Sequence, residues 1–130
     1  MIAIDTNVLV RLVTRDDRAQ AKRAATLFDH EEIFVAKTVL LETEWVLRFS
    51  YELNRPAILN ALKNVVGLPH LTVEDSPAVA EALHLFESGM EFADALHLAS
   101  GRAAVQFATF DARLKKQADT VAPGRHVILA

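Results

Sequence analysis

Four acidic residues stand where a protein could place metal ligands. Asp5 and Asp111 each follow a short apolar run, and Glu42 and Asp94 lie inside apolar segments with helical spacing. A carboxylate that faces an apolar core costs several kcal/mol unless a partner compensates its charge. Because one divalent cation can compensate several carboxylates, the four residues predict a shared metal site.

Asp5 and Asp111 also have a purely structural interpretation. An Asp between a strand and a helix is a common N-cap, whose side-chain oxygen accepts backbone N–H groups of the first helical turn. Ligands of parallel α/β sheets bind beyond the carboxyl ends of the strands, where both residues are expected. Taken singly, each residue therefore fits a cap as well as a metal ligand.

The two glutamates of the central segment are expected to have different roles. Glu42 has Trp45 and Phe49 at i+3 and i+7, so we expect it to share an inward helical face with them. Glu44, two residues after Glu42, points about 200° around the helix from it. Arg48 follows Glu44 at i+4. This spacing predicts a surface ion pair for Glu44 and leaves Glu42 as the functional candidate.

Asp94 lies on a predicted apolar stripe with Leu98, Gly101 and Val105, at i+4, i+7 and i+11. This spacing predicts that Asp94 faces inward. Glu91, one turn earlier, is expected beside the pocket or in solvent rather than among the direct ligands.

The alternation of apolar patterns predicts one α/β domain over residues 1–130. We expect a three-layer α/β/α sandwich with a mostly parallel central sheet. The apolar run Ile2–Ile4 is expected to be a strand that is buried on both faces. Further predicted strands are 33–36, 71–73, 106–109 and 127–129, and predicted helices are 18–29, 39–51, 56–66, 77–88, 92–104 and 112–118.

Composition excludes several classes of protein. The chain has 52% hydrophobic and 24% charged residues, which disfavours extended disorder, and it has no Cys for disulfides or zinc–thiolate sites. No apolar run approaches the about 20 residues that span a membrane, and the N-terminus lacks the features of a signal peptide. We therefore expect a cytoplasmic protein.

The net charge of −3 does not by itself suggest a nucleic-acid partner. An early segment, however, contains five basic residues that could form a basic rim beside the acidic pocket. Because Asp16 and Asp17 interrupt this cluster, an ordinary solvated helix face fits it equally well. The five residues are Arg11, Arg15, Arg18, Lys22 and Arg23.

Other site chemistries find little support. The five histidines show no paired metal-ligand spacing, no serine lies in a nucleophile elbow, and phosphate-binding glycine loops are absent. A phospho-receiver domain would place adjacent acids after its first strand, whereas the only Asp-Asp pair, Asp16–Asp17, lies well beyond Asp5. A non-catalytic binding module of the same fold remains an alternative, although it would be expected to lack one of the acids.

Four segments together resemble the PIN domain, and specifically the VapC-type toxins of bacterial toxin–antitoxin pairs. They are MIAIDTNVLVRL, TVLLETEWVLR, FADALHLA and ATFDARL, in the order of the family. The resemblance maps the family's acids onto Asp5, Glu42, Asp94 and Asp111. It implies that Thr6, Asn7 and Thr109 line or brace the pocket, while Glu91 replaces an aspartate of many relatives and Arg11 is a candidate substrate contact.

The resemblance implies an endoribonuclease that hydrolyses RNA with Mg²⁺ or Mn²⁺, ions that prefer hard oxygen ligands. We expect Asp5 and Asp94 to be the primary ligands, with Glu42 and Asp111 completing the site directly or through water. Unpaired RNA is the expected substrate, since proteins usually read RNA through unpaired regions. A homodimer and a cognate antitoxin protein that inhibits the toxin are the expected partners.

Overall fold

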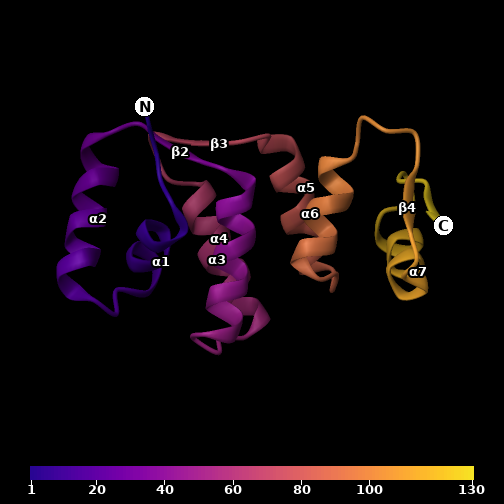
Figure 1. Ribbon diagram of the computed structural model, residues 1–130, viewed down its shortest axis with the longest axis horizontal. Helices are drawn as coiled ribbons and strands as arrows, with labels where there is room; N and C mark the ends of the chain where they lie inside the picture. Colours follow the sequence, from indigo (N-terminus) through magenta and orange to yellow (C-terminus); the bar gives the residue numbers. More distant parts are fainter. The chain divides into compact units, whose positions relative to one another are not determined.

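The computed structural model describes residues 1–130 as two compact units, Met1–Ser76 and Pro77–Ala130 (Figure 1). In both units helices alternate with strands, and every pair of strands is parallel, which confirms the predicted α/β class. The first unit contains β1 (Ile2–Ala3), α1 (Thr6–Thr14), α2 (Arg18–His30), β2 (Ile33–Val35), α3 (Lys37–Phe49), α4 (Arg55–Val66) and β3 (Leu71–Val73).

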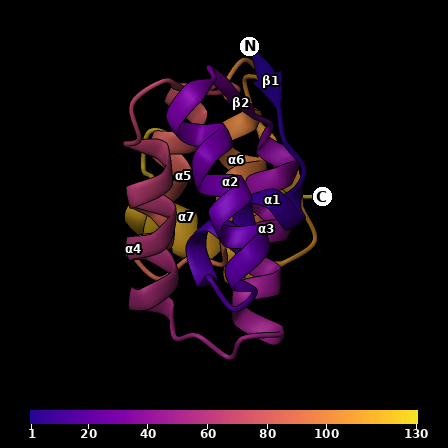
Figure 2. The same cartoon turned by 90° about the vertical axis from the view of Figure 1, so that its left-hand side faces the viewer.

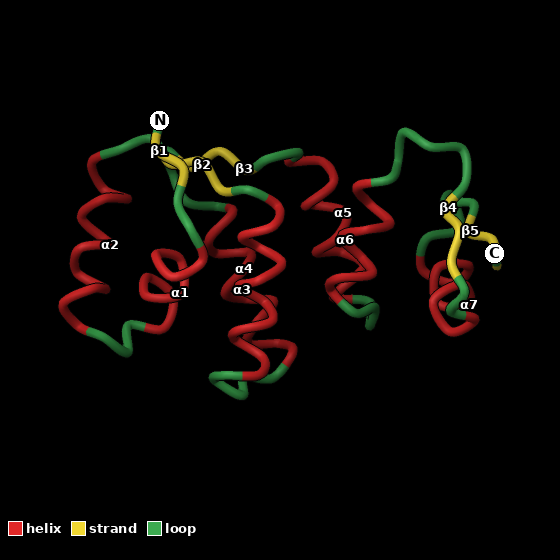
Figure 3. Tube along the Cα trace, in the orientation of Figure 1, coloured by secondary structure: helices red, strands yellow, loops and turns green.

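The strands of the first unit form a sheet in the order β1-β2-β3, and Figure 3 shows the three strands lying side by side. In the central strand β2, Ile33 and Val35 are 1% and 0% exposed, as an apolar strand between two neighbours should be. The prediction that Ile2–Ile4 is buried on both faces is wrong. β1 is an edge strand of this sheet, and Ile2 is 37% exposed whereas Ile4, just beyond the strand, is buried.

Helix α1 is absent from the sequence-based prediction. Its sequence, TNVLVRLVT, is rich in β-branched residues, which have a low helix propensity. Two features outweigh that propensity: Asp5 caps the helix, and Leu9 and Val10 are buried. The helix packs against α2 and α3, and Figures 1 and 2 both show it alongside these helices.

The environment of Glu44 in α3 differs from the prediction. The ion pair with Arg48 is present, with Nε–Oε2 and Nη2–Oε1 distances of 2.8 and 3.2 Å. It is not on the surface, because Glu44 is only 1% exposed and lies on the buried face with Leu40, Thr43 and Leu47. The i+4 spacing thus identified the partner correctly, but the helical face that enters the core was assigned wrongly.

The second unit contains α5 (Ser76–Glu87), α6 (Phe92–Ser100), β4 (Phe107–Thr109), α7 (Ala112–Val121) and β5 (Val127–Leu129). Strands β4 and β5 pair in parallel, and α7 packs against both. Between α5 and α6, Gly89 has φ +109°, a conformation that side chains disfavour, and this turn brings Phe86 and Phe92 into edge-to-face contact at 5.5 Å.

The predicted helix over 92–104 is too long. Helix α6 ends at Ser100, where Gly101 caps it through its backbone N–H, and a series of turns follows. Val105, which was expected to extend the inward stripe of Asp94, is 90% exposed. The stripe therefore stops at Leu98, which is buried.

None of the seven helices is long and apolar enough to cross a membrane.

The buried carboxylate of Glu44 makes Arg48 important for stability. Arg48→Ala should lower the free energy of unfolding by about 1–3 kcal/mol, because the buried carboxylate of Glu44 loses two hydrogen bonds. Arg48 itself is partly exposed, so water can take the place of part of its side chain. Chemical denaturation measures the change. Arg18→Ala, at an exposed position in α2, is the control, and an equal effect of the two substitutions would contradict the importance of the ion pair.

Candidate active site

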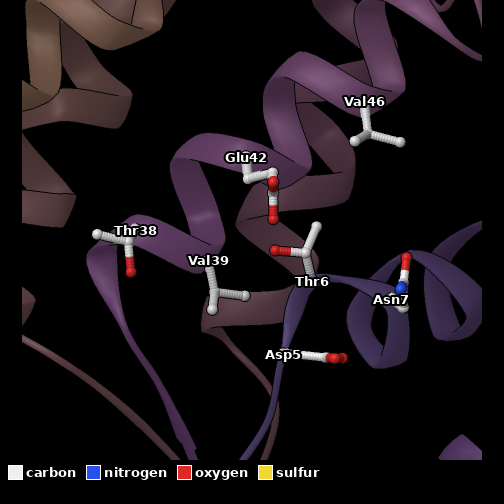
Figure 4. A pocket seen from close by; sticks show the side chains of 7 residues that line it. All are labelled: Asp5, Thr6, Asn7, Thr38, Val39, Glu42 and Val46. Carbon is white, nitrogen blue, oxygen red and sulfur yellow. The ribbon is translucent and has the colours of Figure 1, made fainter.

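Asp5 and Glu42 line one pocket of the first unit, although they are far apart in sequence. The pocket has a volume of about 460 Å³ and is also lined by Thr6 and Asn7. Figure 4 shows Asp5 just before α1 and Glu42 on α3, with the Glu42 carboxylate projecting from its helix toward Thr6. The packing of α1 against α3 thus brings two carboxylates to the same concave surface.

Asp5 is held in place by the helix that follows it. Its backbone is extended, and its Oδ1 accepts the N–H of Val8 at 3.1 Å, so it is the N-cap of α1. The interpretation of Asp5 as a helix cap is therefore confirmed, and the cap uses only one of the two carboxylate oxygens. No hydrogen bond engages Oδ2, and the residue is exposed, so one oxygen remains for a ligand.

Glu42 lies on an exposed face of α3, which corrects the expectation of an inward face. The predicted grouping with Trp45 and Phe49 is present, but these two rings are 53% and 57% exposed. Their ring centres lie 5.1 Å apart, one and two turns along the helix from Glu42. Apolar periodicity thus identified a common face, yet that face borders the pocket and solvent rather than the core.

Asp94 and Asp111 form a second pair of acids, in the second unit. Asp94 lies in the first turn of α6 and is half-buried. Burial raises its pKa above the usual range, and the negative charge of Asp111 raises it further, followed by a smaller contribution from Glu91, while His97 lowers it. The two aspartates are therefore close enough to repel each other when both are charged.

Asp111 resembles Asp5 in its local structure. It follows β4 as the N-cap of α7, and its Oδ1 accepts the N–H groups of Arg113 and Leu114 at 2.9 and 3.1 Å. Its own N–H donates to Oγ1 of Thr109 at 3.0 Å. Thr109 therefore braces the backbone of Asp111, and the second carboxylate oxygen of Asp111 accepts no hydrogen bond.

Two residues that were candidates for supporting roles, Glu91 and Arg11, have surroundings that the sequence pattern does not specify. Glu91 is the N-cap residue of α6 but makes no side-chain cap hydrogen bond, and it is exposed. Arg11 belongs to a polar network with Asp16 and Tyr51, which lies 40 residues away in sequence. Only the tertiary contact between α1 and the end of α3 brings these groups together.

The donor set fits Mg²⁺ or Mn²⁺. Both pairs offer carboxylate oxygens, which these hard cations prefer, and neither includes a thiolate or a set of imidazoles. A cation beside Asp94 and Asp111 would also relieve the repulsion that raises the pKa of Asp94. Within either unit alone, no three His, Asp or Glu side chains converge on one point.

The pairing of Asp94 with Asp111 predicts a specific titration. Without metal, the Asp94 carboxyl should titrate above the ordinary Asp value of about 3.9. Asp111→Asn should lower that midpoint, because it removes the repelling charge while an asparagine still caps α7. Carbon-detected NMR of the carboxyl groups measures both, and an unchanged midpoint in the variant would exclude the coupling.

The sign of the linked stability change follows from the raised pKa. Folding disfavours the charged form of Asp94, so its ionisation destabilises the protein as pH rises from the unfolded-state pKa through the folded-state pKa. Asp94→Asn should therefore raise the melting temperature of the metal-free protein at neutral pH. The gain should vanish below about pH 3.9, where Asp94 is protonated in both states.

A comparison with known protein families identifies the family of the chain. The model of the PIN domain, a nuclease-type fold, matches residues 2–119 and so runs through both units. No characterised protein and no solved structure gives a significant match. Since the family match covers most of the chain and includes all four acids, this protein belongs to the PIN-domain family.

Proposed function

We propose that the protein is an Mg²⁺- or Mn²⁺-dependent endoribonuclease whose metal ligands are Asp5, Glu42, Asp94 and Asp111. PIN domains are generally metal-dependent ribonucleases, which supports the reaction class. The observation that carries the proposal is the pairing of the acids. Asp5 and Glu42 line one pocket, and the charge of Asp111 raises the pKa of Asp94.

The chain supplies rigid oxygen ligands at both pairs. Asp5 and Asp111 are fixed by their cap hydrogen bonds, and Thr109 fixes the backbone of Asp111. Ligands that are held in place before the substrate arrives cost no ordering at the moment of reaction. The bound cation would supply a water activated near neutral pH and positive charge for the phosphate oxygens.

We propose unpaired RNA as the substrate. The Asp5–Glu42 pocket is open to solvent, and its lining offers carboxylates, hydroxyls and an amide rather than a long basic surface for a duplex. A flexible single strand can bend a phosphate into such a pocket, whereas proteins recognise duplex RNA mostly by its shape and backbone.

Isosteric substitution of the aspartates tests the catalytic proposal. Asp5→Asn and Asp94→Asn should each lower RNA cleavage in Mn²⁺ by more than about 100-fold. Removing only the hydrogen-bond partner of a metal ligand typically lowers activity about 10–100-fold, so loss of the ligand itself should cost more. Asparagine preserves the cap on Val8, so α1 should stay folded. Cleavage of a labelled single-stranded RNA measures the effect, with EDTA as the metal-free reference.

Asp29→Asn is the matched control, since Asp29 is an exposed aspartate in α2 outside both pairs. It should keep full activity. Glu44→Gln is not a suitable control, because this buried residue is paired with Arg48 and its loss would weaken the fold itself. Full activity of either Asp5→Asn or Asp94→Asn would rule out the assigned metal ligands.

We further propose that the ribonuclease is the toxin of a toxin–antitoxin pair, acts as a homodimer in the cytoplasm, and is inhibited by a cognate antitoxin. The support for the toxin role is that the four motif segments resemble those of VapC-type toxins in their amino-acid sequences and in their order. The exposed Trp45 and Phe49 provide an apolar surface beside the acidic pocket, and Arg48 stacks on Phe49 at 4.6 Å. Aromatic residues and arginine are enriched where proteins bind one another.

Expression in a bacterial host tests the toxin role. Wild-type protein should arrest growth, whereas Asp5→Asn should not, because the arrest requires RNA cleavage. Coexpression of the protein encoded by the adjacent reading frame should restore growth. Arrest by both the wild type and Asp5→Asn would contradict a nuclease toxin, and Asp29→Asn controls for expression.

A further inference from the structure

A second pocket of the first unit adjoins the acidic one. It has a volume of about 430 Å³ and lies between α1 and α2. Asp5 and Asn7 line both pockets, so the two hollows meet at these residues. A strand of RNA that presents one phosphate to Asp5 can therefore continue into the α1–α2 pocket.

The α1–α2 pocket has two basic lining residues. Arg11 of α1 and Arg23 of α2 both line it, and Asp5 is its only acidic lining residue. A polyanion that enters from the acidic pocket would thus meet two guanidinium groups, of which Arg11 is already paired with Asp16. Charge complementarity favours a phosphodiester backbone as the occupant.

Arg11 is fixed by neighbouring side chains. Its Nε donates to Oε1 of Gln20 at 2.8 Å, and its Nη1 donates to Oδ1 of Asp16 at 3.1 Å and to the Tyr51 hydroxyl at 3.0 Å. The Tyr51 hydroxyl in turn donates to Oδ2 of Asp16 at 2.5 Å. Arg11 therefore shapes the wall of the pocket, while Asp16 neutralises much of its charge.

Arg23 differs from Arg11 in having no hydrogen-bond or ion-pair partner. It is exposed, and it shares the pocket-facing side of α2 with Gln20, Ala24 and Leu27, at the spacing of one helical face. An unpaired guanidinium at the wall of a pocket can bind a phosphate through two hydrogen bonds. Ala24 and Leu27 offer apolar contact to a ribose or base beside it.

We infer that the α1–α2 pocket binds the RNA strand next to the phosphate that is cleaved, with Arg23 contacting a neighbouring phosphate. This inference rests on the proposed ribonuclease function, because it deepens the description of the same site. Arg23 is then a substrate-binding residue rather than a catalytic one. Arg11, which is held by Gln20, Asp16 and Tyr51, forms a fixed part of the pocket wall.

Substitution of Arg23 separates binding from chemistry. With a single-stranded RNA that the wild type cleaves, Arg23→Gln should raise KM by about tenfold, the effect of one lost charged contact, and leave kcat within about twofold, because the metal ligands are untouched. The dependence of log kcat/KM on log salt should become shallower by about 0.7, the contribution of one phosphate contact on a single strand.

Arg18→Gln is the matched control. Arg18 is an exposed arginine of the same helix that does not line the pocket. It should leave KM and the salt dependence close to those of the wild type. Melting temperatures of both variants should match that of the wild type, since neither side chain is buried.

A modified substrate identifies the contacted phosphate. The position of cleavage is mapped first. RNAs are then made that each carry one uncharged methylphosphonate, at a linkage within about three nucleotides of the cleaved bond. Binding sites for single strands typically cover at least about four nucleotides, so a neighbouring contact should fall within this range. One of these linkages should raise KM for the wild type as much as Arg23→Gln does. The same linkage should have no further effect on Arg23→Gln, because the two changes remove one interaction.

The outcomes distinguish this inference from the proposed function. If the wild type cleaves RNA but Arg23→Gln behaves like Arg18→Gln, the inference is overturned and the ribonuclease assignment stands. If the wild type cleaves no RNA in Mn²⁺, both are overturned. If Arg23→Gln keeps its RNA kinetics but no longer binds the antitoxin, the pocket binds a protein, which also overturns the inference.

Discussion

The cap hydrogen bonds of Asp5 and Asp111 are the interactions on which the candidate site depends. Each aspartate terminates a strand–helix junction and uses one carboxylate oxygen to satisfy backbone N–H groups. The positive end of the helix dipole further favours a negative charge there. The hydrogen bonds that begin the two helices thus also fix the positions of these carboxylates, each of which keeps one oxygen without a hydrogen bond.

Asp94, the acid that is paired with Asp111, is destabilised rather than stabilised by its surroundings. Asp94 gains no cap hydrogen bond, and burial together with its acidic neighbour raises its pKa even though it lies in the first turn of α6. The helix dipole is therefore weaker here than desolvation and repulsion. A half-buried acid beside another acid is costly to the fold for as long as nothing compensates its charge.

The sequence predicted most elements of the fold because their patterns are unambiguous. The bounds of β3 and β5 agree with the structure, and α2 and α4 differ by one residue at one end. Helix α1 was missed because β-branched residues hide a helix that a cap and tertiary packing stabilise. The buried face of α3 was misassigned because an i+4 ion pair is usually exposed, whereas Glu44 lies in the core.

The network around Arg11 also bears on how this protein can diverge. It ties together the last turn of α1, the short α1–α2 connection at Asp16, and Tyr51 beyond the end of α3. None of these groups belongs to the four acids, although Arg11 lines the pocket between α1 and α2 together with Asp5. Mutations in the α1–α2 connection can therefore change the wall of this pocket at Arg11 while the cap hydrogen bond of Asp5 and the position of Glu42 on α3 stay as they are.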